Sequence, residues 1–192
     1  MSRVDRIIKR IQKGPFYRVT YNYKLILKLF QNKYTHMEFC EYEIVSNERC
    51  HQVLDIRDIN VERVFKQIGT EQIVLLVRYK GNIAGHAVLK PPKNTFLGNH
   101  WYEKALIHYC YVAPQYRGKN IYPYMMANLA KIAFDMFNIL EIYIFTDKYN
   151  LASQKGIQKV GFTYIETGYE LGWGGVSLLK YWKKDAFLNH EN

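Results

Sequence analysis

Residues 111–122 contain the best candidate for an anion-binding site in this sequence. An apolar strand ends there, a proline follows, and a short Arg-Gly-Lys turn at residues 117–119 leads directly into a helix. Backbone N–H groups at the start of a helix have no partner within it and the helix dipole is positive there, so a pyrophosphate at this position accepts several hydrogen bonds at once. Gly118 lets the backbone approach such a ligand closely. A plain connection between strand and helix with solvated basic side chains is the alternative.

The pattern of apolar residues predicts the elements that position this turn. Strands are expected where apolar residues run or alternate, and helices where they recur at intervals of three and four. The prediction is a strand at 38–45, a helix at 55–68, a hairpin of strands at 73–79 and 83–89 with Gly81-Asn82 as its turn, a strand at 106–112, a helix at 122–137, a strand at 141–145, a helix at 150–160, and strands at 162–168 and 175–182. Residues 2–13 predict a short amphipathic helix, and residues 17–30 fit either a strand or a helix.

This order of elements, with Val-x-Pro-x-x-Arg-Gly at residues 112–118, resembles the GNAT superfamily of N-acyltransferases. A second similarity lies downstream, where Asn150-Leu151-Ala152-Ser153 and then Lys159-Val160-Gly161-Phe162 match the family's Asn-x-x-Ser/Ala to Lys-x-Gly-Phe pattern. The resemblance spans about residues 38–182. It implies an α/β (α+β) fold whose mixed, mostly antiparallel central sheet splays at the acyl-CoA cleft and is flanked by helices. It also implies acyl-coenzyme A, with an acetyl or longer short-chain acyl group, as co-substrate and no metal.

The coenzyme signature of the family is only partly kept in this chain. Arg117 matches it, whereas Asn120 and Tyr122 stand where the family has glycine and glycine or alanine. Asparagine adopts positive φ more readily than most residues, so Asn120 preserves the turn, and the ring of Tyr122 is expected to project away from the coenzyme. The resemblance implies that coenzyme-binding residues are Tyr111, Val112, Arg117, Gly118, Lys119, Asn120, Ile121, Tyr122 and Asn150, with the backbone N–H of Tyr111 or Val112 as oxyanion donor.

His108 is the candidate general base, because it lies on the strand before the turn, where some family members carry a catalytic histidine, and because imidazole titrates near neutral pH. A hydrogen-bonded core or rim histidine is the competing interpretation. Alternation along the strand would place Leu106, His108 and Cys110 on one face. Cys110 is interpreted as a packing thiol rather than an acyl-carrying nucleophile, since the family does not usually need one.

The usual general acid of the family is a tyrosine seven positions after Asn150, and this chain has Ile157 there. Tyr149 is the candidate substitute because it precedes the same helix. Solvent could also protonate a thiolate, since the reference pKa of a thiol is only about 8.5.

The acceptor is expected to be a molecule that carries an amine and also negative charge, because aromatic residues on loops accompany a basic N-terminal segment. The candidate substrate-binding residues are His100, Trp101 and Trp173, whose flat rings suit a sugar or a nucleobase. A nucleotide-linked amino sugar of surface-polysaccharide synthesis fits both features. The alternatives are a protein or peptide N-terminus, a small amine, and a non-enzymatic nucleic-acid-binding module. The tryptophans could equally serve an interface.

The net charge of +10 is concentrated at one end of the chain. Residues 1–36 hold nine Lys and Arg against one Asp, a balance of +8, which leaves +2 for the rest. These residues are therefore predicted to form a basic N-terminal arm of a helix and an extended segment, and residues 37–192 the acyltransferase domain. A solvated helix face followed by a strand that packs on the domain or on a partner subunit is the alternative for the arm.

The remaining composition predicts a cytoplasmic protein of one domain. No apolar run approaches the roughly 20 residues that cross a bilayer, and no secretory signal is recognised. The three cysteines, Cys40, Cys50 and Cys110, match no metal or disulfide spacing. The sequence does not fix the oligomeric state, and a homodimer is one candidate.

Overall fold

The computed structural model describes residues 15–30, 32–45, 72–92, 104–173 and 176–184. In these ranges the chain forms one eight-stranded sheet in the order β2-β3-β4-β5-β6-β1-β7-β8. Neighbouring strands are antiparallel except β5 and β6, which are parallel. The mixed, mostly antiparallel sheet predicted from the sequence is therefore confirmed. The predicted helices at 2–13 and 55–68 lie outside the described residues.

One wing of the sheet is built from β2 (Cys40–Val45), β3 (Ile73–Tyr79) and β4 (Asn82–Lys90). The predicted hairpin of β3 and β4 is confirmed, but its two turn residues are Lys80 and Gly81 rather than Gly81 and Asn82. Both have positive φ, 51° and 78°, which is the backbone that a tight two-residue hairpin requires. Asn82 steadies the turn by donating from its side-chain amide to the Lys80 carbonyl oxygen at 3.2 Å.

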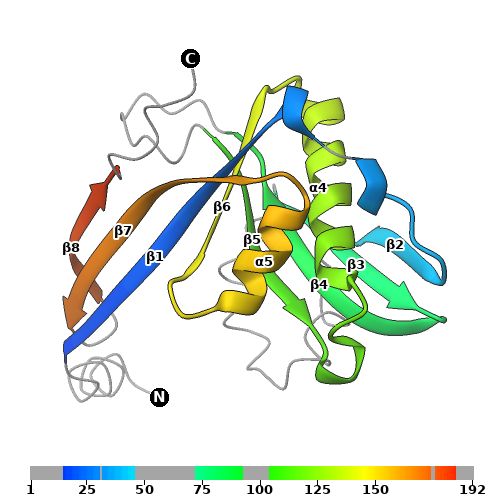
Figure 1. Cartoon of the computed structure of the whole chain (residues 1–192), viewed down its shortest axis with the longest axis horizontal. Coiled ribbons are helices and arrows are strands. Elements are labelled where there is room, and N and C mark those ends of the chain that lie inside the picture. The colour runs from blue at the N-terminus through cyan, green and yellow to red at the C-terminus, as the bar shows by residue number, and fades with distance from the viewer. Residues whose placement is uncertain (1–14, 31, 46–71, 93–103, 174–175, 185–192) are drawn as a thin grey trace, which may run out of the picture.

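The centre of the fold is β5 (Ala105–Val112), the 3-10 turn η4 (Pro114–Tyr116), α4 (Ile121–Phe137) and β6 (Glu141–Asp147). β5 and β6 pair only over the three positions from Ala105 to Ile107, and beyond them the two strands separate. Figure 1 shows β6 swinging away from β5, with α5 (Leu151–Lys159) beside α4. The predicted splay of the sheet is thus confirmed.

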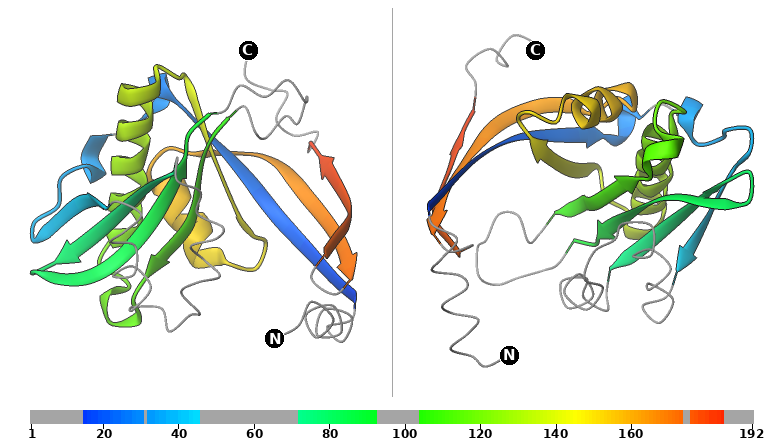
Figure 2. Two further views of the ribbon diagram at one scale, coloured as in Figure 1. Left: turned by 180° about the vertical axis from the view of Figure 1, so that it is seen from behind. Right: turned by 90° about the horizontal axis from the view of Figure 1, so that it is seen from below.

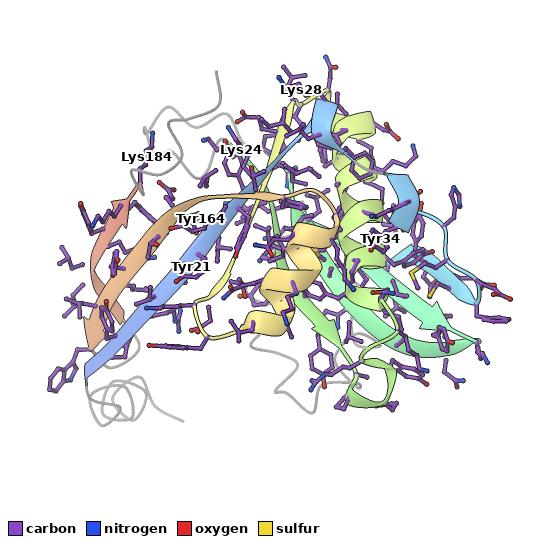
Figure 3. All side chains as sticks on the ribbon, viewed as in Figure 1. Tyr21, Lys24, Lys28, Tyr34, Tyr164 and Lys184 are labelled. Atoms are coloured by element: carbon purple, nitrogen blue, oxygen red, sulfur yellow. The ribbon has the colours of Figure 1, made fainter. Side chains whose placement is uncertain are left out.

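The second wing contains β1 (Pro15–Ile26), β7 (Thr163–Trp173) and β8 (Val176–Lys183), and Figure 2 shows it bending away from the β3 and β4 wing. The undecided stretch at 17–30 is a strand up to Ile26, followed by the 3-10 turns η1 (Leu27–Leu29) and η2 (Asn32–Tyr34). Tyr21 of β1 and Tyr164 of β7 lie next to each other in Figure 3, with ring centroids 5.3 Å apart.

The position of β1 corrects the expected boundary at residue 36. β1 pairs with β6 on one side and with β7 on the other, so it is an interior strand of the sheet. It carries two of the nine Lys and Arg residues of the N-terminal segment, Arg18 and Lys24, yet Tyr23 and Leu25 on the same strand are buried in the core. Residues 15–26 therefore belong to the domain, as the packed-strand alternative proposed, and residues 1–14 lie outside the described residues.

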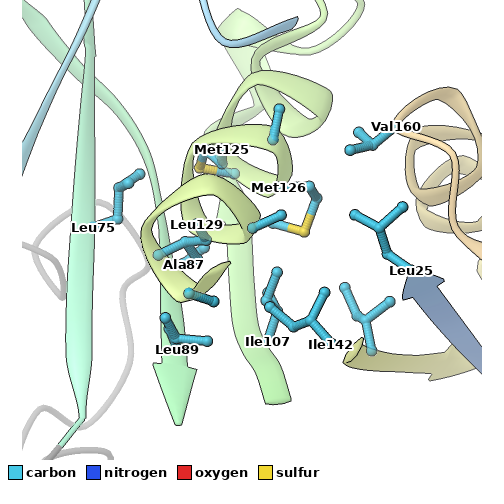
Figure 4. Packing of buried hydrophobic residues seen from close by; sticks show 14 of the residues in the cluster. Leu25, Leu75, Ala87, Leu89, Ile107, Met125, Met126, Leu129, Ile142 and Val160 are labelled. Carbon is cyan, nitrogen blue, oxygen red and sulfur yellow. The ribbon is translucent and has the colours of Figure 1, made fainter. Parts of the chain in front are cut away.

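The hydrophobic core lies between α4 and the middle of the sheet. Met125, Met126 and Leu129 of α4 are fully buried against strand residues such as Leu89 and Ile107 (Figure 4). Val160 after α5 joins the same cluster, which fixes α5 next to α4. In the described part of the chain, no helix is both long and apolar enough to span a membrane.

Candidate functional site

A β-bulge in β5 redirects the side chains of this strand. Tyr109 has a φ of 49°, and the pairing with β4 shifts between His108 and Tyr111. An extra residue in one strand reverses the alternation of faces beyond it. The Cys110 sulfur consequently lies 3.9 Å from the Met126 sulfur on the α4 side. The expectation that Leu106, His108 and Cys110 share one face is therefore wrong for Cys110.

The turn after β5 has the backbone that the sequence predicted. Gly118 and Asn120 both have positive φ, 79° and 56°, and the helix begins at Ile121, one residue earlier than expected. Asn120 makes no cap hydrogen bond with its side chain, so that side chain does not occupy the N–H groups at the start of α4. Its Oδ1 atom instead accepts a hydrogen bond from the Lys159 ammonium at 2.8 Å, which ties the end of α5 to the start of α4.

A cavity of about 540 Å³ opens beside this turn, between β5, α4 and α5. It lies on the same side of the sheet as the two helices. Eight of the nine predicted coenzyme-binding residues line it, namely Tyr111, Val112, Arg117, Gly118, Asn120, Ile121, Tyr122 and Asn150. Lys119 does not line it, because its ammonium lies 5.5 Å from the centroid of the Tyr79 ring instead.

The charge of the cavity wall is positive. Arg117, Lys155 and Lys159 line it, and no Asp or Glu is among its lining residues in the described ranges. Asn150 accepts a hydrogen bond from the Ser153 backbone N–H at 3.1 Å, so it caps α5. The wall combines cationic side chains with an open helix N-terminus, which is the chemistry that binds a pyrophosphate.

Tyr122 does not project away from this cavity, contrary to expectation. Its ring packs against Gly156 of α5, where an added Cβ would come within 2.6 Å of the Tyr122 Cδ1 atom. Both residues line the cavity. The glycine of α5 therefore makes room for the tyrosine that replaces a small residue of the family pattern.

His108 lies on β5 before the bulge and lines neither this cavity nor the second one described below. Its Nε2 atom is 2.9 Å from Gln72 Oε1. An amide oxygen can only accept a hydrogen bond, so Nε2 carries the hydrogen and donates it to Gln72, while Nδ1 keeps the lone pair. Burial, together with the nearby charge of Lys90, lowers the pKa of His108 from 6.5 to about 4. The imidazole is therefore neutral at physiological pH.

Two of the other predicted site residues do not line this cavity. Tyr149 is 80% exposed and lines neither cavity, so its role as the general acid stays a prediction. Trp173 is half exposed at the end of β7 and also lines neither cavity. His100 and Trp101 lie outside the described residues.

A second cavity of about 480 Å³ lies on the opposite side of the sheet. Leu106 lines it, and because its neighbour Ile107 packs in the core under α4, Leu106 faces the other way. The remaining lining residues come from β1, β4, β6, β7 and β8 and are Arg18, Thr20, Lys90, Phe145, Gly168, Tyr169, Glu170, Lys180 and Trp182. Glu170 lies 3.5 Å from Arg18 and 3.7 Å from Lys180. The cavity thus combines three cations and one carboxylate with three aromatic rings.

None of the residues that line this second cavity is among the predicted substrate-binding residues His100, Trp101 and Trp173. Trp182 packs over Gly168, where an added Cβ would clash with its ring and lie 2.7 Å from Thr20 Oγ1. These three residues lie on three strands that the sequence does not show to be adjacent. Only the register of β1 with β7 and of β7 with β8 brings them together.

Comparison with known proteins decides the family. A sequence model of the acetyltransferase (GNAT) family matches residues 33–162, more than half of the chain. The chain belongs to the GNAT acetyltransferase family. No curated protein matches the sequence. Among the described residues, no group of three His, Cys, Asp or Glu side chains is placed to hold a metal ion.

Solved structures share the fold at low sequence identity. An acetyltransferase of the GNAT family from Colwellia psychrerythraea has a TM-score of 0.60 at 17% identity, with 83% of this chain and 57% of that chain covered. AAC(6')-Iy in complex with the bisubstrate analogue CoA-S-monomethyl-acetylneamine has a TM-score of 0.52 at 13% identity, with 65% and 90% covered. A glucosamine N-acetyltransferase region of a fungal multi-domain β-N-acetylglucosaminidase has a TM-score of 0.60 at 10% identity, with 81% and 21% covered.

The chain spans 66%, 57% and 54% of the length of three of the solved chains that it resembles. These likenesses establish the fold, and the family match establishes the GNAT acetyltransferase domain, whose co-substrate is an acyl-coenzyme A.

Proposed function

We propose that this chain transfers an acetyl or short acyl group from acyl-coenzyme A to the primary amine of an anionic acceptor, with a nucleotide-linked amino sugar as the preferred candidate. The observation that carries the proposal is the pair of cavities on opposite sides of β5. Cys110, Tyr111 and Val112 border the cavity on the helix side, and Leu106 borders the other. β5 and its neighbour β6 separate just beyond Ile107.

The helix-side cavity is assigned to the coenzyme. The pyrophosphate is held at the start of α4, where the N–H groups of Ile121 and Tyr122 have no partner within the helix, and Arg117 and Lys159 add positive charge. The pantetheine arm then runs along β5 toward Cys110. This placement puts the thioester beside Cys110, on the part of β5 that no longer pairs with β6, so an amine can approach it from the far side of the sheet.

Val112 is the better of the two candidate oxyanion donors. The Ala113 N–H donates to the Ala84 carbonyl oxygen on β4 at 2.9 Å, and successive N–H groups of a strand point to opposite edges. The Val112 N–H therefore points toward the open edge beside β6. Its carbonyl oxygen lies on that same edge and accepts from Arg117 Nε at 3.3 Å. An amide fixed in this direction stabilises the charge that develops on the thioester oxygen.

His108 is proposed as the base that removes the proton of the attacking amine. The amine becomes strongly acidic once it bonds to the carbonyl carbon, and a neutral imidazole with its Nδ1 lone pair then accepts that proton. Lys90 is one of the two causes that lower the pKa of His108. An anionic group of the acceptor next to Lys90 offsets that charge and raises the pKa of His108. His108 is therefore a stronger base when the anionic acceptor is bound.

The second cavity suits a nucleotide-linked amino sugar because it joins cations to flat rings. Arg18, Lys90 and Lys180 fit a diphosphate, and Trp182 and Tyr169 offer faces for a sugar or a base. The fungal relative named for glucosamine acetylation acts on an amino sugar, although the likeness to it concerns the fold. A cytoplasmic place of action stays part of the proposal, because the spacing of the three cysteines in the sequence matches no disulfide framework.

The test combines coenzyme binding with an acceptor panel. Calorimetry with coenzyme A comes first, followed by thiol release from acetyl-CoA with a nucleotide-linked amino sugar, the same amino sugar without its nucleotide, and a peptide with a free N-terminus. We expect kcat/KM to be at least about tenfold higher for the nucleotide-linked sugar, because hydrogen bonds to charged groups contribute about 1.5–3 kcal/mol. Preference for the peptide would instead establish the N-terminal acetylation alternative.

A pair of lysine variants checks where that preference arises. Lys90→Met should remove most of the advantage of the nucleotide-linked sugar. Lys183→Met removes the same charge from β8 but does not line the cavity, and it should leave the advantage intact. Equal effects of both variants would show that the preference reflects the overall charge of the protein and not this cavity.

A further inference from the structure

Gln72 holds the proposed base from a strand that is not its neighbour in the sheet. Gln72 lies directly before β3, and His108 lies on β5, with β4 between the two strands (Figure 1). The hydrogen bond of 2.9 Å between His108 Nε2 and Gln72 Oε1 therefore crosses β4, where Val88 is the residue paired with His108. A contact that spans three strands holds the imidazole ring in one orientation on the sheet.

This hydrogen bond also decides where the second ring nitrogen points. The two nitrogens of an imidazole are distinct, and each faces its own direction from the ring. Because Nε2 is turned toward β3, the lone pair of Nδ1 is turned away from it. The neighbour of β5 on its other side is β6, and the two strands are unpaired beyond Ile107, the residue before His108. The nitrogen that accepts a proton is thus turned away from the β3–β4 hairpin.

Gln72 offers the imidazole an oxygen that carries no charge. In the described part of the chain, Lys90 of β4 is the charged side chain that acts on His108, and the Tyr109 ring centroid lies 4.6 Å from that of the imidazole. When the imidazole takes up a proton, the Nε2–H bond to Gln72 becomes charge-assisted and therefore stronger. Gln72 consequently stabilises the protonated ring that Lys90 disfavours.

We propose that Gln72 is a positioning residue for the acyl transfer, because its side-chain oxygen keeps the hydrogen of His108 on Nε2 and so leaves the Nδ1 lone pair to accept the proton of the attacking amine. This inference rests on the proposed role of His108 as the base. In each cycle one proton moves from the amine nitrogen to Nδ1 and then to solvent, which restores the neutral ring with its hydrogen on Nε2. Gln72 neither gains nor loses a proton.

Nitrogen-15 NMR of the imidazole rings tests the tautomer in the unaltered protein, without coenzyme or acceptor. The chain has six histidines, and the His108 signals are identified by their loss in His108→Gln. At pH 7 we expect two-bond couplings that place the hydrogen on Nε2 and a lone pair on Nδ1. A hydrogen on Nδ1, or signals averaged over both tautomers, would overturn the inference.

Two variants of Gln72 test its effect on the reaction. Gln72→Leu removes the oxygen and should lower kcat about tenfold or more at unchanged KM for acetyl-CoA, because a charge-assisted hydrogen bond is lost. Gln72→Glu keeps an oxygen in place and should retain kcat. Its carboxylate should also raise the pKa of His108, which moves the acid limb of the pH profile of kcat/KM to higher pH by about 1 or more. Equal losses of kcat in the two variants would show that residue 72 only fills space, and would overturn the inference.

The His108→Gln protein is the matched background for these variants. If Gln72 acts through His108, Gln72→Leu should have no further effect on kcat in that background, whereas an equal loss in both backgrounds would overturn the inference. If His108→Gln lowers kcat and Gln72→Leu does not, the inference is overturned while the proposed base stands. If His108→Gln leaves kcat unchanged, the proposed base fails and the inference fails with it. If neither Gln72 variant folds, the tautomer of the unaltered protein decides.

Discussion

The two cavities of this domain are built in different ways from the same sheet. The coenzyme cavity is formed by two short stretches, at 110–123 and 150–159, which pack directly on each other. The second cavity, called the acceptor cavity below because we propose that it binds the acceptor, draws its walls from six strands, and some of the residues that meet there are more than 150 positions apart in sequence. A local structure can be recognised from its motif, whereas a surface assembled by strand pairing carries no motif. The experiments below test whether the two cavities can be damaged separately.

The largest effect is expected at His108, on the strand that both cavities share. His108→Gln should lower kcat at least about 100-fold at neutral pH, because a general base contributes 10² or more, while coenzyme affinity stays unchanged. His36→Gln is the control, since His36 is exposed and lines neither cavity. An unchanged kcat for His108→Gln would eliminate this histidine as the base.

The same residue should govern part of the pH dependence of stability. The pKa of His108 is about 4 in the folded chain and near 6.5 when unfolded, so between these values only the unfolded chain binds the proton. Stability is fully present above pH 6.5 and falls as the pH drops toward 4, by roughly 3 kcal/mol at most. Denaturant unfolding of the protein and of His108→Gln at pH 7 and pH 4 measures the difference. A constant gap between the two proteins would show that His108 is not buried in its neutral form.

The coenzyme cavity should be damaged alone by Gly118→Val. A β-branched residue at a φ of 79° costs about 1–3 kcal/mol and moves the turn, so the affinity for coenzyme A should fall tenfold or more by calorimetry. Gly81→Val places the same strain at a φ of 78° in the β3–β4 hairpin, and Gly81 does not line the cavity. It should reduce stability but leave coenzyme affinity unchanged. Equal losses of affinity in the two variants would argue against a pyrophosphate at residue 118.

The acceptor cavity should be damaged alone by Gly168→Ala, with the smallest effect of the series. The added methyl group displaces the Trp182 ring, so we expect KM for the acceptor to rise several-fold, up to about tenfold, with the affinity for coenzyme A unchanged. Steady-state kinetics at saturating acetyl-CoA measures this. If the affinity for coenzyme A fell as well, the two cavities would be coupled through the sheet and the contrast between them would be weaker.

Several features of the fold followed from local sequence. The hairpin of β3 and β4, the helix that starts at Ile121 and the Asn150 cap each depend on residues within a few positions of one another. Positive φ at Asn120 could also be anticipated, because asparagine adopts it readily. At Tyr109 the same backbone could not be anticipated, since nothing in a tyrosine indicates a bulge, and the face of Cys110 was therefore misassigned.

What the sequence determined alone was the chain of local elements, the backbone of the turn at 117–120 and the family pattern, because hydrophobic period and turn chemistry act over short distances. Only the tertiary structure decided that β1 is an interior strand, that Tyr122 points into the coenzyme cavity beside Gly156, and that Trp182 meets Gly168 and Thr20. These facts depend on strand register and on packing between helices. Both are set by the burial of side chains that are far apart in sequence, and no short pattern records which of them will meet.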